Sequence, residues 1–139
     1  MSVVTLSLPP STAHRSFLAF DFGTLRVGVA NGNSLTRSAQ PLRTIAATGA
    51  ARFEAIGRLI DEWQPDELVV GVPFHPDGAA HENTERARRF ARQLAGRFAL
   101  PVIEVDERYS TTEAASRGAR DLDAASAAII LDQFLNQLP

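Results

Sequence analysis

The pattern of apolar and polar positions predicts a strand-rich start to the folded part of the chain. A short apolar run, 17–20, ends in a carboxylate at Asp21, and a second apolar run, 27–30, follows a glycine-containing turn. Two apolar runs joined in this way are typical of a β-hairpin. A third strand is expected over Ala39–Ile45, which would continue an antiparallel meander.

The period then changes to that of a helix. Large apolar residues recur at steps of three and four from residue 50 onwards, and Pro65 is expected to end this helix. The residues on its predicted apolar face are Phe53, Ile56, Ile60 and Trp63. The continuously apolar stretch 68–72 follows and is typical of a strand buried on both faces.

The last third of the chain repeats this alternation. An amphipathic helix is expected over Glu82–Phe98, a buried strand over 102–105 and a final helix over Asp123–Leu135. Between them, a Ser/Thr cluster at 110–112 precedes Glu113, which is typical of a capped short helix.

The order of these elements predicts an α/β fold with a mixed sheet and helices on its faces. Ligands in such sheets bind near the carboxyl ends of the central strands. Residues 1–16, with two prolines and several Ser/Thr residues, are expected to form a flexible N-terminal extension, and 17–139 a single domain.

Composition narrows the class of protein. The chain has 139 residues, a net charge of −2 and no cysteine, which excludes disulfides and thiolate metal sites. No apolar run approaches the roughly 20 residues of a membrane-spanning helix, and no secretory signal is evident, so we expect a cytoplasmic protein with no membrane partner. The chain has no lysine, and arginine has a planar fork that suits phosphate, but the codon bias of a GC-rich genome is the better explanation of this composition.

Carboxylates stand at the ends of several predicted elements. Asp21 ends the first strand, Asp106 and Glu107 end the last, and Asp123 begins the final helix on its apolar stripe. If the first and fourth strands are neighbours, these groups can converge at one edge of the sheet. Clustered carboxylates repel one another unless they share a proton or bind a hard divalent cation such as Mg²⁺. Such an ion can promote hydrolysis of a phosphodiester.

Each carboxylate also has an ordinary structural interpretation. Asp123 can be a helix N-cap, which is as good an explanation as catalysis from position alone. Asp106 or Glu107 can pair with Arg108 or face solvent, and at most one of the two is expected to face the site. Asp21 is harder to explain structurally, because a carboxylate after four apolar residues is costly to bury without a partner.

The segment 20–30 (FDFGTLRVGVA) resembles the opening motif of the RuvX/YqgF family, which comprises Holliday-junction-resolvase-like proteins also assigned to the processing of pre-16S ribosomal RNA. The resemblance covers nearly all of residues 17–137. It continues, in order and at suitable spacing, through 70–73 with 77–78, 106–108 with 110–112, and 123–131.

This resemblance implies a ribonuclease H-like fold, with a five-stranded mixed sheet whose first three strands are antiparallel, and an acidic metal site. By motif, Asp21, Glu107 and Asp123 would be the catalytic carboxylates, and Asp106 a further metal ligand. The remaining matched positions would contact the substrate: Arg26, Arg108, Thr24, Gly71, Pro73, Ser110 and Thr111. Two positions depart from the family pattern, since Leu25 replaces a basic residue and the stretch 117–122 is short.

The resulting hypothesis is a nuclease that uses Mg²⁺, or Mn²⁺, and acts on structured RNA such as precursor rRNA or on branched DNA. Two alternatives stay open at this point. The acids can be remnants in a non-catalytic nucleic-acid-binding module, or the Asp-Phe-Gly-Thr hairpin can belong to an actin-like nucleotide-binding domain. The histidines near the predicted entrance, His75 and His81, are expected to be exposed loop residues.

Overall fold

Strand β1 (Ser16–Phe22) lies at the centre of a five-stranded sheet with the order β3-β2-β1-β4-β5. The computed structural model describes residues 14–75, 77–80, 82–107 and 121–139. β2 (Val27–Asn33) and β3 (Ala39–Ile45) continue from β1 as an antiparallel meander, whereas β4 (Glu67–Val72) and β5 (Val102–Asp106) are parallel to β1. The predicted mixed sheet is therefore confirmed, and so is the predicted contact between the first and fourth strands.

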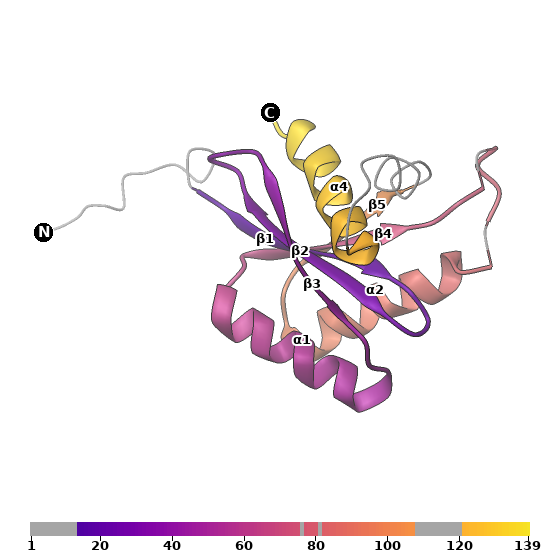
Figure 1. The fold of residues 1–139 in the computed structure, drawn as a ribbon. Helices are drawn as coiled ribbons and strands as arrows, with labels where there is room; N and C mark the ends of the chain where they lie inside the picture. Colours follow the sequence, from indigo (N-terminus) through magenta and orange to yellow (C-terminus); the bar gives the residue numbers. More distant parts are fainter. Residues whose placement is uncertain (1–13, 76, 81, 108–120) are drawn as a thin grey trace, which may run out of the picture.

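Helices cover both faces of this sheet, as predicted (Figure 1). α1 (Gly49–Trp63) and α2 (Thr84–Phe98) lie against one face, and α4 (Leu122–Asn136) lies against the other. Side chains of β1 alternate between the two cores because successive strand residues point to opposite faces. Leu18 and Phe20 pack in the core under α1 and α2, while Phe17 and Ala19 pack under α4. Asp21 has the same parity as Phe17 and Ala19, so it faces α4.

The buried face of α1 differs from the predicted one. Arg52, Ile56 and Leu59 are buried, whereas Trp63, predicted to lie on the apolar face, is 39% exposed. The face is thus rotated towards Arg52, whose guanidinium donates to the carbonyl oxygens of Ala47 (2.8 Å) and Thr24 (3.3 Å). A buried polar group is tolerated when hydrogen bonds replace its water, so Arg52 occupies a position that a pattern of apolar residues does not reveal.

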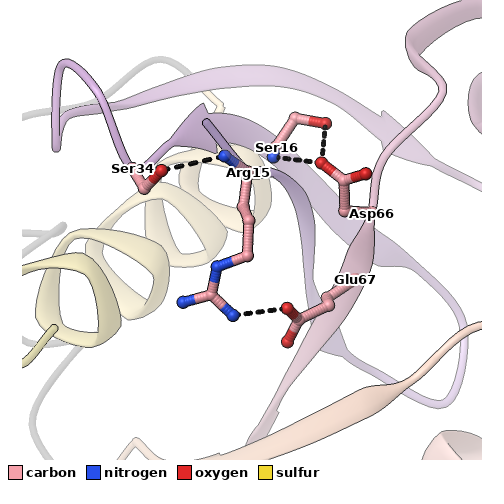
Figure 2. Close-up of polar contacts among 5 residues, drawn as sticks. All are labelled: Arg15, Ser16, Ser34, Asp66 and Glu67. Atoms are coloured by element: carbon pink, nitrogen blue, oxygen red, sulfur yellow. Dashed lines mark hydrogen bonds and ion pairs between the residues drawn. The ribbon is translucent and has the colours of Figure 1, made fainter. Parts of the chain in front are cut away.

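The entry of the chain into β1 is fixed by polar contacts (Figure 2). Arg15 forms an ion pair with Glu67 (2.6 Å), and its backbone N–H donates to the hydroxyl of Ser34 (2.9 Å). The N–H of Ser16 donates to Asp66 (2.8 Å). Arg15 and Ser16, which the sequence placed in the extension, are therefore tied to the sheet.

α2 begins at Thr84, two residues later than the pattern predicted, after Asn83 as N-cap. Among the helices of the described ranges, none is both long and apolar enough to cross a membrane. The predicted short helix after the Ser/Thr cluster at 110–112 lies outside the described residues.

Candidate active site

Asp21 and Glu107 meet at the carboxyl end of the central strands, on the face covered by α4. Asp21 lies beside Gly71 of β4, and Gly71 in turn lies beside Val105 of β5. Glu107 follows β5 directly, and its backbone N–H donates to the carbonyl oxygen of Val72 (3.2 Å). Because Val105 packs in the core under α4 and side chains alternate, Glu107 points to the same side as Asp21.

The two carboxyl groups lie close enough for a hydrogen bond between them to affect the pKa of each. Glu107 is only 8% exposed, and no N–H or O–H group of the described residues donates to its buried Oε2 atom. Two carboxylates cannot hydrogen-bond unless a proton lies between them. The pair is therefore held together by a shared proton or by a cation.

Burial raises the pKa of both groups. The pKa of Glu107 rises to about 10, first because burial removes water from the carboxylate, then because of the negative charge of Asp21 and the hydrogen bond with it, and finally because of Asp106. The pKa of Asp21 rises to about 6, because burial and the charge of Asp123 outweigh its hydrogen bond with Glu107. In the absence of a cation, these pKa values place the shared proton on Glu107 at neutral pH, so that the O–H of Glu107 donates a hydrogen bond to the Asp21 carboxylate.

Gly71 provides the space in which Glu107 lies. A Cβ atom at this position would be 3.0 Å from Glu107 Oε2 and 2.4 Å from Cδ1 of Ile130 on α4. The resemblance implied a substrate contact for Gly71, but the residue is buried between β1 and β5. We conclude that Gly71 acts by its missing side chain, which lets the Glu107 carboxyl group approach Asp21.

Asp123 lies on the first turn of α4 and is not the N-cap of the helix. Asp121 takes that position, where its side chain accepts from the N–H of Ala124 (3.2 Å) and also from the hydroxyl of Thr44. The role of N-cap, which was the structural interpretation of Asp123, is therefore taken by Asp121. Asp123 instead forms an ion pair with Arg26, with 3.0 Å between Nε and Oδ2.

Asp106 does not join the other carboxylates. It has the parity of Glu104, which pairs with Arg88 of α2 on the opposite face of the sheet, and it is exposed. The negative charge of Asp106 contributes to the raised pKa of Glu107. The structure therefore separates Asp106 from Asp21. Of the adjacent residues Asp106 and Glu107, it is Glu107 that faces the site.

Two of the remaining predicted substrate contacts, Thr24 and Pro73, follow β1 and β4 at the same edge of the sheet. Thr24 is exposed in the β1–β2 turn, and its carbonyl oxygen accepts from Arg52. Pro73 is half-buried after β4, and its carbonyl oxygen accepts from the hydroxyl of Thr84. The predicted contacts Arg108, Ser110 and Thr111 lie outside the described residues.

Asp21, Glu107 and Asp123 fit a divalent cation if Asp123 exchanges its contact with Arg26 for the metal. Within the described ranges, no group of three or more His, Cys, Asp or Glu residues is arranged to hold a metal ion. However, the half-buried Asp21 and the buried Glu107, which has an unpartnered oxygen, are hard oxygen ligands of the kind that Mg²⁺ and Mn²⁺ bind. A third carboxylate, Asp123, is close enough for its charge to raise the pKa of Asp21, but its side chain is bound to Arg26.

Glu107→Gln is expected to stabilise the cation-free protein at about pH 8 by more than ~1.4 kcal/mol, the free energy of one pKa unit. Because the pKa of Glu107 rises from 4.5 to about 10, the native protein binds more protons than the unfolded chain across this interval. Wild-type stability should therefore fall as pH rises from about 4.5 towards 10. The amide of glutamine can donate to Asp21 without titrating, so the variant should lose most of this slope.

Urea unfolding in EDTA at about pH 5.5, 7 and 8.5 measures this difference. The matched control is Glu62→Gln, an exposed residue of α1, which should keep the wild-type slope. Equal slopes for Glu107→Gln and wild type would show that Glu107 does not hold the proton in the folded protein.

The five-stranded mixed sheet, with three antiparallel strands followed by two parallel ones and helices on both faces, is a ribonuclease H-like fold. The model of the RuvX family, described as Holliday junction resolvase, matches residues 15–137. The chain belongs to the RuvX family, as its opening motif predicted.

Individual relatives agree with this assignment. A protein of Polaromonas sp. (strain JS666 / ATCC BAA-500) is 69% identical over 125 residues, which are 90% of this chain and 91% of that protein. One of Albidiferax ferrireducens is 69% identical over 124 residues, which are 89% of this chain and 80% of that protein. Both carry the name "Putative pre-16S rRNA nuclease".

Solved structures extend the likeness of fold. RuvC of T. thermophilus, solved in complex with a Holliday junction substrate, is similar with a TM-score of 0.55 at 16% identity, over 86% of this chain and 93% of RuvC. A second structure of Thermus thermophilus RuvC gives a TM-score of 0.53 at 13% identity, over the same shares of the two chains. At these identities the likeness concerns the fold alone.

Proposed function

We propose that this protein is a divalent-metal-dependent nuclease that hydrolyses phosphodiester bonds of precursor 16S rRNA in the cytoplasm. The observation that carries the proposal is the pair of the half-buried Asp21 and the buried Glu107, in which Oε2 of Glu107 has no donor among the described residues. A fold that brings two acids together at a cost in free energy suggests a function that needs them. The names of the relatives and the description of the family support phosphodiester cleavage as that function.

Asp21, Glu107 and Asp123 would hold the cation, with Mg²⁺ as the first candidate and Mn²⁺ as the second. When bound, a cation of this kind stabilises negative charge on the phosphate and makes the attacking water more acidic. Glu107 must lose its proton for this purpose, because only a carboxylate is a good ligand. Cation binding should therefore release a proton at neutral pH and should be tighter as pH rises.

The chain's own residues would bind and orient the nucleic acid. Arg26 is 63% exposed beside Asp123 and presents a guanidinium at the edge where Asp21 and Glu107 lie. Arginine suits this task because its planar fork can bind two phosphate oxygens at once. We infer that Arg26 positions a phosphate over the carboxylates, and that the exposed β1–β2 turn containing Thr24 contacts the neighbouring nucleotide.

A cleavage panel tests the proposal. Purified full-length protein is incubated with a labelled precursor of the 16S rRNA 5′ region or with a four-way DNA junction, in EDTA, in Mg²⁺ and in Mn²⁺. We expect metal-dependent cleavage that favours the RNA and stops when EDTA is added. Preferred cleavage of the junction would replace the RNA with branched DNA as substrate, and binding without cleavage in either metal would favour the non-catalytic binding module.

A further inference from the structure

Arg26 and Asp123 form a contact that can be exchanged for other partners. Their side chains are 63% and 35% exposed, and the Nε–Oδ2 distance of 3.0 Å is that of a direct ion pair. Ion pairs with this much access to water are weak, because solvent screens the charges and the long side chain loses freedom. Water, phosphate and cations can therefore reach both partners.

Within the described ranges, neither side chain has another bond that would hold this pair in place. The N-cap of α4 is Asp121, so Asp123 contributes nothing to the cap through its side chain. Arg26 lies just before β2 in the exposed turn, and among the described residues its side chain forms no polar contact other than this ion pair. The pair can open without breaking the helix or the sheet.

The Arg26–Asp123 ion pair keeps Asp123 from acting as a third metal ligand beside Asp21 and Glu107. Asp21 and Glu107 are already in contact, and Asp123 influences Asp21 through its charge. Asp123 nevertheless belongs to no cation-binding group in the described part of the chain. The guanidinium thus occupies the carboxylate that would serve as third ligand, and its positive charge lies where it repels a divalent cation.

We propose that Arg26 competes with the divalent cation for Asp123, and that a phosphate of the nucleic acid which binds Arg26 frees Asp123 for the metal. This proposal rests on the proposed function and adds a mode of regulation to the same site. Substrate and cation would then bind cooperatively, because each removes the contact that opposes the other. Arg26 would be a positioning residue that discourages cation binding when no nucleic acid is present.

Cation binding to the full chain is measured by the rise in unfolding temperature with Mg²⁺ concentration, which needs no activity. Arg26→Gln should bind Mg²⁺ about threefold to tenfold more tightly than wild type, as expected on losing a partly exposed ion pair beside a divalent cation. Arg26→Lys, which keeps the charge, should stay near wild type. Arg58→Gln removes the same charge from an exposed position on α1 and should change the affinity less than twofold.

Two further measurements separate the mechanism from a general effect of charge. In an Asp123→Asn background, Arg26→Gln should have no effect on Mg²⁺ affinity, because residue 123 no longer carries the charge for which Arg26 and the cation compete. An RNA hairpin in excess should tighten Mg²⁺ binding to wild type more than to Arg26→Gln.

The outcomes distinguish this proposal from the function on which it rests. If Mg²⁺ stabilises wild type, but Arg26→Gln binds it no more tightly than Arg58→Gln does, the competition is refuted and the metal site stands. If Mg²⁺ stabilises neither wild type nor Arg26→Gln, the metal site itself is refuted, and the competition with it. Each variant's cooperative unfolding in EDTA shows whether it is folded.

Discussion

Asp21→Asn is expected to lower the metal-dependent cleavage rate by roughly a thousandfold or more while leaving the protein folded. Asparagine keeps the size of the side chain but removes the charge that would bind a cation at the end of β1, and loss of a central active-site group commonly has an effect of this size. The fold should not suffer, because burial raises the pKa of Asp21 and so opposes its ionisation. The neutral amide removes that unfavourable contribution.

The measurement is kcat/KM on the RNA substrate of the cleavage panel, together with stabilisation by Mg²⁺. Both should be lost in Asp21→Asn. Asp61→Asn, which changes an exposed residue of α1 in the same way, should retain both. Cleavage by Asp21→Asn within threefold of wild type would place the catalytic centre elsewhere, or attribute the cleavage to a contaminating nuclease.

The sheet and Asp21 could be predicted from sequence because their signals are local. Strand residues alternate between the two faces of a sheet, so a carboxylate after four apolar residues must lie at a sheet end or be buried at a cost. The antiparallel start and the parallel strands that follow are likewise expressed in the order of the apolar runs. These expectations concern neighbouring residues, and the structure confirms the elements they predicted.

Which of the other acidic residues face the site could not be predicted from the local sequence. Asp106 and Glu107 are adjacent, and only the register of β5 against β4 determines which of them faces α4. Asp121 and Asp123 are two residues apart at the start of one helix, and either is a reasonable N-cap by type. The contact of Asp121 with Thr44 of β3, 77 residues away in sequence, accompanies its choice as the cap.

Arg52 was missed for a related reason. An arginine beside Phe53 reads as the polar border of an apolar face, so the pattern predicted a face that extends to Trp63. The buried guanidinium has carbonyl oxygens as partners, and these come from the β1–β2 turn and the loop before α1. Such partners exist only after folding. The one available signal was the spacing of Arg52, Ile56 and Leu59 by four and three, which also describes a helical face.

Gly28 lets the start of α4 pack close to β2 beside the site, and its replacement is expected to lower the stability of the protein strongly. It lies opposite Asp21 in the β1–β2 pairing, on the face covered by α4. A Cβ atom there would be 1.8 Å from the backbone carbonyl oxygen of Asp123 and 2.8 Å from the backbone nitrogen of Ala124. Both neighbours are backbone atoms, so no side-chain rotation can relieve the clash. The first turn of α4 can approach Asp21 only because residue 28 has no side chain.

Gly28→Ala is therefore expected to destabilise the protein by roughly 3 kcal/mol or more, at the upper end of the range for overpacking. The matched control is Gly96→Ala within α2, where an added Cβ atom meets nothing within 4 Å. That change should stabilise the protein by about 0.5–1 kcal/mol, because alanine favours the helix over glycine. Urea unfolding of both variants thus tests one chemical change with opposite expected signs.

The consequence of Gly28→Ala for the site should exceed its consequence for the rest of the fold. To admit the new methyl group, the start of α4 must move away from β2, and Asp123 moves with it. At temperatures where the variant is still folded, stabilisation by Mg²⁺ should be weaker than in wild type, whereas Gly96→Ala should bind Mg²⁺ as wild type does. If Gly28→Ala unfolded at the same urea concentration as the wild type, α4 would not approach β2 closely at this residue. The position of Asp123 beside Asp21 would then lose its structural basis.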